Sequence, residues 1–206
     1  AFTAEDSQFF FGREIEIEAL WKKLRRPHLL GLIGPSGAGK TSFLRAGLIP
    51  AAPEGWGVLI CTPGEGPFAA LARALVPEIS DDPEAVSKLV DFELNGPHLF
   101  GRWRERHARA LLVVDQFEEL FTQNPPEVQA GFAALIGRLA RDADVHVLLS
   151  MRDDFLYRCH DHEDLLPVFN GLAPVKAPGR DDLHRALVQP AARRGYSFED
   201  EALVDE

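Results

Sequence analysis

The segment that most constrains the fold is residues 34–41, whose sequence is GPSGAGKT. It matches the pattern G-x-x-x-x-G-K-[ST] at every fixed position. An apolar run at 28–33 precedes it, and a helical pattern begins near Lys40. A strand that leads through a glycine-rich loop into a helix is the setting in which this pattern binds phosphate. The sequence therefore predicts a nucleotide-binding α/β domain.

The residue types of this loop suit a nucleotide polyphosphate. Its glycines let backbone N–H groups turn toward phosphate oxygens, and the start of the helix adds partial positive charge. Lys40 is expected to reach the β- and γ-phosphates, and the Thr41 hydroxyl is expected to bind Mg²⁺. The loop contacts phosphates and not bases, so it leaves ATP and GTP open. The expected contacts are Gly34, Pro35, Ser36, Gly37, Ala38, Gly39, Lys40, Thr41 and Ser42.

The order of apolar and amphipathic segments predicts the architecture. Strands are expected at 28–33, 57–62, 110–115, 145–150 and 172–177, and helices at 13–26, 40–48, 67–77, 82–94, 98–108, 126–141 and from 180 onward. Short buried strands separated by helices favour a parallel sheet with helices on both faces. The expected fold is the three-layer α/β sandwich of an ASCE-type P-loop NTPase. Ligands of such sheets bind beyond the carboxyl ends of the strands.

The second motif is acidic and follows the apolar run at 111–114. Its Asp115 is expected to hold Mg²⁺ directly or through water. Many P-loop ATPases carry a catalytic glutamate at the next position, but here it is Gln116, which cannot act as a base. Glu118 and Glu119 come three and four residues after Asp115, and one helical turn would return either to its side. Either could orient or deprotonate the attacking water, with Glu118 expected nearest. Both could instead simply favour a helix N-terminus.

Arg152 ends the expected fourth strand, in the sequence LLSMR. That strand should lie beside the strand that feeds the phosphate loop, so the arginine is expected to point toward the γ-phosphate. A guanidinium there could sense whether this phosphate is present. The alternative is a structural salt bridge with Asp153 or Asp154.

Composition narrows the choice of partners and location. The net charge of −10 argues against a nucleic-acid partner, because an acidic domain repels phosphate backbones. The two cysteines, Cys61 and Cys159, form no CxxC motif, which favours reduced thiols and a cytoplasmic protein, and the histidines near Cys159 fit no common zinc spacing. The sequence contains no run of 18 apolar residues, so it predicts no membrane span. The chain lacks an initiating Met and ends inside a helical pattern, so a fragment of a longer protein is expected.

Four segments in order resemble one family, the STAND ATPases, and within it the bacterial novel STAND NTPases with their DQFEEL-type acidic motif. The segments are FFFGREIEIEAL, GPSGAGKTSFLRAGLIP, LLVVDQFEELFT and LLSMRDDF. The resemblance implies a slow ATPase that rests with ADP, exchanges it for ATP, and then self-associates within the intact protein. It also implies effector and sensor domains outside this fragment, in signalling roles such as bacterial defence or cell death.

The resemblance also implies a domain division and further contacts. Residues 1–178 would form the nucleotide-binding domain, with 1–26 as its adenine-side segment and helix, and residues 179–206 would begin a helical lid. By position, Phe11, Gly12 and Arg13 would contact the base or ribose, and Pro190 would approach from the lid. The aromatic residues before Gly12 could equally serve as a hydrophobic staple onto the first helix.

Three other functions stay open for this loop. A P-loop kinase shares GPSG-x-GK, but the region after Leu48 offers no arginine-rich lid or acceptor site. A transporter ATPase shares GPSGAGKT, but its LSGGQ signature is missing. A non-hydrolysing scaffold would use nucleotide only to fold, and phosphate release would separate it from an ATPase.

Overall fold

The computed structural model describes residues 2–26, 28–80, 92–177, 179–196 and 198. Its centre is a five-stranded parallel sheet in the order β2-β3-β4-β1-β5. The strands are β1 (Leu29–Gly34), β2 (Trp56–Cys61), β3 (Arg109–Val114), β4 (His146–Arg152) and β5 (Leu172–Pro174). The predicted parallel α/β fold is confirmed, and β4 lies beside β1 as expected.

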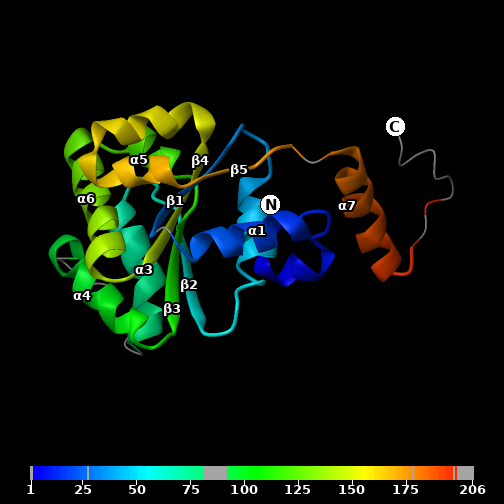
Figure 1. Cartoon of the computed structure of the whole chain (residues 1–206), viewed down its shortest axis with the longest axis horizontal. Coiled ribbons are helices and arrows are strands. Elements are labelled where there is room, and N and C mark those ends of the chain that lie inside the picture. Colours follow the sequence, from blue (N-terminus) through cyan, green and yellow to red (C-terminus); the bar gives the residue numbers. More distant parts are fainter. Residues whose placement is uncertain (1, 27, 81–91, 178, 197, 199–206) are drawn as a thin grey trace.

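Helices cover both faces of the sheet (Figure 1). The α-helices are α1 (Glu14–Leu24), α2 (Lys40–Ser42), α3 (Pro67–Ile79), α4 (Phe92–Arg104), α5 (Glu118–Gln123), α6 (Pro126–Asp142) and α7 (Arg180–Arg193). The other helical segments are η1 (Ala4–Phe9), η2 (Phe43–Leu48), η4 (Asp153–Asp161) and η5 (Glu163–Asn170). Helices α3, α4 and α6 cover one face, while α1 and η2 cover the other.

Side-chain alternation along the central strands builds these two layers. On β3, Leu112 and Val114 join the core under α3, α4 and α6, whereas Leu111 and Val113 join the core under α1 and η2. Both faces of β3 are fully buried, which explains why its sequence is a continuous apolar run and not an alternating one.

Several boundaries differ from the expected ones. The expected helix 40–48 is an α turn, α2, that widens into a π-helical turn, η2. The expected helix 82–94 falls mostly outside the described residues, and α4 is described from Phe92. The 3-10 segments η4 and η5 were not predicted, because short 3-10 turns have no strong periodic signal. Among the described residues, no helix is long and apolar enough to cross a membrane.

Helix α7 lies outside the sheet layers, beside the N-terminal segment (Figure 1). Arg185 pairs with Glu14 at 3.1 Å, and Arg193 donates to the Gln8 carbonyl at 2.8 Å. The guanidinium of Arg193 lies 4.8 Å from the centre of the Phe11 ring, so its charge faces the aromatic surface. These contacts join α7 to the N-terminal segment. The division at residues 178 and 179 stays a prediction.

Candidate functional site

A cavity of about 260 Å³ opens at the carboxyl ends of β1, β3 and β4. Its lining comes from the glycine-rich loop, the turn after β3, the start of α5 and the end of β4: Ser36, Gly37, Ala38, Gly39, Lys40, Thr41, Ser42, Asp115, Gln116, Glu118 and Arg152. The tertiary structure thus brings together three motifs that are far apart in sequence. This is the edge where a parallel sheet offers room for a ligand.

The loop holds the Lys40 side chain over its own backbone. Lys40 Nζ donates to the Gly34 carbonyl at 2.7 Å and to the Pro35 carbonyl at 3.0 Å. Partial burial lowers the pKa of Lys40, against the opposing attraction of Glu118, Asp153 and Asp115. Among the described contacts the Lys40 ammonium bonds only to backbone carbonyls, and a phosphate in the cavity would offer it a charged partner.

Two glycines of the loop are required by backbone conformation. Gly37 and Gly39 have φ of +79° and +80°, in the left-handed region that side chains rarely adopt. A Cβ at either position would meet nothing within 4 Å, so the space around them is open. Their role is therefore to allow the turn of the loop.

The Asp115 carboxylate is 1% exposed at the cavity. Its Oδ1 accepts the N–H of Gln116 at 3.0 Å, while the buried Oδ2 has no hydrogen-bond partner among the described residues. A buried carboxylate oxygen in this state is costly unless a cation or a donor reaches it. Oxygen ligands suit Mg²⁺, and the Thr41 hydroxyl lines the same cavity. The residues present therefore fit a magnesium ion.

The chain turns sharply after Asp115. Gln116 has a φ of +53°, which is unusual for a residue other than glycine, and Phe117 donates its N–H to the Ser150 carbonyl at 2.8 Å. This turn starts α5 directly beside the end of β4. Local strain of this kind is concentrated at functional sites.

The two candidate bases point in different directions. Glu118 lines the cavity, and its Oε2 accepts the backbone N–H of Arg152 at 3.4 Å. Glu119 instead accepts the N–H of Gly64 at 3.2 Å, in the loop between β2 and α3, and does not line the cavity. The start of α5 therefore places Glu118 in the cavity that Asp115 lines and directs Glu119 to Gly64. The catalytic role of either glutamate stays a prediction.

Arg152 lines the cavity but is also paired with a neighbour. Its guanidinium makes two bonds to the Asp154 carboxylate, with Nε–Oδ1 of 3.0 Å and NH2–Oδ2 of 2.5 Å. The hydrogen bond and charge of Asp154 raise the pKa of Arg152. Arg152 therefore lines the cavity and forms the salt bridge at the same time, and its role as a phosphate sensor stays a prediction.

Of the residues expected near the base, Arg13 contacts the loop directly. It is 8% exposed and donates to the Ala38 carbonyl at 3.4 Å and to the Lys176 carbonyl at 2.9 Å. Phe11, Gly12 and Pro190 do not line the cavity at the carboxyl ends of the strands.

Contacts to α7 occupy the segment before Arg13. Arg193 covers the Phe11 ring, and Gly12, with a φ of +93°, lies against the backbone of Asp182. Pro190 lies within α7 itself. The base contacts inferred from the resemblance therefore stay predictions.

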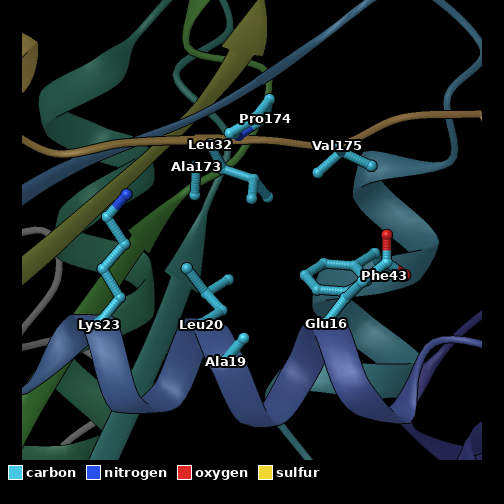
Figure 2. A pocket seen from close by; sticks show the side chains of 9 residues that line it. All are labelled: Glu16, Ala19, Leu20, Lys23, Leu32, Phe43, Ala173, Pro174 and Val175. Atoms are coloured by element: carbon cyan, nitrogen blue, oxygen red, sulfur yellow. The ribbon is translucent and has the colours of Figure 1, made fainter.

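A second pocket, of about 240 Å³, lies between α1 and β5 (Figure 2). Its apolar walls include Leu20, Phe43 and Val175, and Glu16 and Lys23 stand at its ends. Glu16 also pairs with Arg13 at 3.4 Å, so this groove adjoins the residue that contacts the loop.

Ser150 is a buried polar residue that no sequence motif marked as part of the site. It is 0% exposed on β4, and its Oγ has no hydrogen-bond partner among the described residues. The available signal was a hydroxyl inside an otherwise mostly apolar strand.

Three solved structures have folds similar to this chain. The Walker-type ATPase paby2304 of Pyrococcus abyssi matches with a TM-score of 0.70 and 17% identity, over 98% of this chain and 63% of that one. AMPPCP-bound DnaA from Aquifex aeolicus matches with a TM-score of 0.55 and 14% identity, over 94% and 55%. The Aeropyrum pernix Orc1 protein in complex with DNA matches with a TM-score of 0.51 and 19% identity, over 88% and 49%. At these identities the likeness shows the fold alone.

This chain spans between about half and just under two thirds of the length of these structures. A search of curated proteins found no match. The model of one protein family, Novel STAND NTPase 1, matches residues 1–206. With the phosphate loop, Asp115 and Arg152 converging on one cavity, the chain belongs to the Novel STAND NTPase 1 family.

Proposed function

We propose that this chain binds ATP or ADP with Mg²⁺ and hydrolyses ATP slowly, as the nucleotide switch of a larger signalling protein. The observation that carries the proposal is the shared cavity, where Lys40, Asp115, Glu118 and Arg152 approach one space from three separate elements. A polyphosphate would offer negative charge to Lys40 and Arg152, and its metal ion would offer positive charge to Asp115. The negative net charge of −10 makes a nucleic-acid partner a poor match.

Each residue has a distinct part in the proposed reaction. Backbone N–H groups of residues 36–41 and the Lys40 ammonium hold the phosphates, while Thr41 and Asp115 hold the metal ion. An Mg²⁺ ion held by these two residues would supply positive charge for the phosphate oxygens. Glu118 orients the attacking water and accepts its proton, because its carboxylate lines the cavity from the start of α5.

The proposed switch depends on the γ-phosphate. Arg152 is bound to Asp154 in this structure, and a γ-phosphate offers the guanidinium a competing partner with more charge. Exchange of ADP for ATP would then move Arg152, and this change would favour self-association of the intact protein. Effector and sensor domains outside residues 1–206 would respond to this change, in the cytoplasm.

The nucleobase of the bound nucleotide is proposed to lie on the N-terminal side of the loop. Arg13 ties that segment to Ala38, and Phe11 offers an aromatic surface. Because Arg193 covers the Phe11 ring, base binding would displace this contact and involve α7. We therefore propose that residues 179–206 begin a lid, with Pro190 on its nucleotide-facing helix.

A thermal-shift titration tests nucleotide binding. Mg-ADP at about 100 times its Kd should stabilise the fold by about 2.7 kcal/mol. Lys40→Ala should lose most of this stabilisation, while Lys22→Ala, which removes a lysine of an exposed ion pair on α1, should keep it. Equal or absent shifts for the wild type and both variants at millimolar nucleotide would contradict the proposal.

A second candidate, a scaffold that binds but does not hydrolyse ATP, is favoured by one observation. The position after Asp115 is Gln116, and Glu118 already accepts a backbone N–H. Phosphate release from ATP separates the two candidates. No release above background, for the intact protein with its activating partner, would support the scaffold.

A further inference from the structure

Asp115, which lines the cavity, and Ser150 on the adjacent strand each carry a buried polar atom without a partner among the described residues. Asp115 Oδ2 and Ser150 Oγ are both inaccessible to solvent, and neither has a hydrogen-bond partner in the described part of the chain. Most buried polar atoms in folded proteins are hydrogen-bonded, so an exception beside a ligand cavity is a candidate to bind a ligand or an ordered water. Two such exceptions at neighbouring positions indicate a shared partner.

The sheet register places these groups side by side. Val114 on β3 pairs with Leu149 on β4, so the next residues along the two parallel strands are Asp115 and Ser150. The N–H of Asp115 continues the ladder to the Cys61 carbonyl at 2.8 Å, which keeps Asp115 in line with its strand.

Because side chains alternate along a strand, those of Asp115 and Ser150 lie on the same face of the sheet. Val113 and Leu148 belong to the core under α1 and η2, and Asp115 and Ser150 each follow them by two positions. On the other side, Ser150 pairs with Leu32 of β1, the strand that feeds the phosphate loop. The hydroxyl therefore lies between the strand of Asp115 and the strand of the loop.

A purely structural role does not account for this hydroxyl. The backbone carbonyl of Ser150 already accepts the N–H of Phe117, so the turn after Asp115 does not need the side chain. Its neighbours along β4, Leu149 and Met151, are fully buried apolar residues. Alanine would fill nearly the same volume without burying a polar atom.

We propose that Ser150 is a positioning residue for the magnesium ion: its hydroxyl and Asp115 together hold one water of the Mg²⁺ hydration shell. This inference rests on the proposed function. Magnesium keeps several of its waters when it binds to proteins, and residues that hold such waters orient the ion. In the absence of the ion, the hydroxyl is a buried polar group that destabilises the fold.

The test compares the metal-free fold with the metal-dependent binding of nucleotide. Ser150→Ala should raise the melting temperature of the chain without nucleotide and metal by about 2–4 °C, because a buried unpaired hydroxyl is removed. In calorimetric titrations, the Mg²⁺ concentration that half-saturates the ternary complex with ADP should rise about tenfold or more. ADP affinity in excess EDTA should stay unchanged, because the hydroxyl serves the metal and not the phosphates.

Two control variants separate the hydroxyl from general effects on the core. Ser150→Thr keeps the hydroxyl and should keep the Mg²⁺ requirement of the wild type, even where its extra methyl group lowers the melting temperature. Val147→Ala changes a buried residue on β4 that belongs to the opposite core layer. It should lower the melting temperature and leave the Mg²⁺ requirement unchanged.

Each other result overturns the inference. A lower metal-free melting temperature for Ser150→Ala would mean that the hydroxyl has a structural partner, and an unchanged Mg²⁺ requirement would mean that it does not serve the ion. Equal losses of ADP affinity with and without Mg²⁺ would assign it to phosphate. If wild-type binding shows no Mg²⁺ dependence, the magnesium part of the proposed function fails as well, which the wild-type titration alone reveals.

Discussion

Glu118 Oε2 accepts the backbone N–H of Arg152 at 3.4 Å, so the candidate base on α5 is tied to the strand end that carries the candidate phosphate sensor. This contact joins residues 34 positions apart. It forms because Phe117 already anchors the turn after β3 to Ser150 on β4. Water activation and phosphate sensing are thus expected to respond to one another.

The first prediction separates the two glutamates. Glu118→Gln should slow ATP hydrolysis by about 100-fold, because a positioned general base contributes on this order. Nucleotide affinity should change little, since the side chain contacts water and not phosphate. Glu119→Gln is the matched control and should keep the rate, because Glu119 bonds to Gly64 outside the cavity. Phosphate release by the intact protein is the measurement, and a slow Glu119→Gln beside a normal Glu118→Gln would reverse the assignment.

The second prediction concerns discrimination between ATP and ADP. Arg152→Ala should weaken binding of an ATP analogue by about tenfold or more and leave ADP nearly unchanged, because a charge-assisted bond to the γ-phosphate contributes about 1.5–3 kcal/mol. Calorimetric titrations with both nucleotides measure this. Equal losses for both would make Arg152 a structural residue.

The third prediction uses the partner of that arginine. Asp154→Ala should tighten binding of the ATP analogue by about twofold to fivefold, because exposed ion pairs of this kind contribute about 0.2–1 kcal/mol and Asp154 competes with the γ-phosphate. ADP affinity should not change. Asp161→Ala is the control, because Asp161 lies on the same segment, η4, but pairs with Arg158. Weaker ATP binding by Asp154→Ala would mean that Asp154 positions Arg152 for phosphate.

The fourth prediction locates the nucleobase of the bound nucleotide. Phe11→Ala should weaken ADP and ATP binding alike by about threefold to tenfold, because an aromatic contact contributes about 0.5–1.5 kcal/mol and both nucleotides share the base. Ala19→Phe, which fills the groove between α1 and β5, should leave both affinities unchanged. The reverse pattern would place the base in that groove.

The fifth prediction tests how α7 is held. Gly12→Ala should loosen α7, because a Cβ at this position would approach the Asp182 carbonyl to 2.8 Å. Gly64→Ala provides the control, since Gly64 shares a positive φ of +56° but has nothing within 4 Å of the added carbon. Hydrogen exchange of residues 180–193 is the measurement. Faster exchange in both variants would trace the effect to general destabilisation.

The sequence alone determined the parts of this protein that depend on neighbouring residues. The loop at 34–41, Asp115 at the tip of an apolar strand and the alternation of strands with helices each follow from local patterns, because phosphate binding and parallel sheets impose those patterns. The confirmed fold and family follow from the same segments. The roles of the site residues remain predictions.

Only the tertiary structure decided which side chains meet. The sequence left both Glu118 and Glu119 as candidate bases, with Glu118 favoured, but the direction of α5 brings Glu118 into the cavity and leads Glu119 to Gly64. The unpartnered hydroxyl of Ser150 likewise follows from the pairing of β3 with β4. Such relationships depend on strand register and packing between residues far apart in the chain, and one sequence contains no local pattern that specifies them.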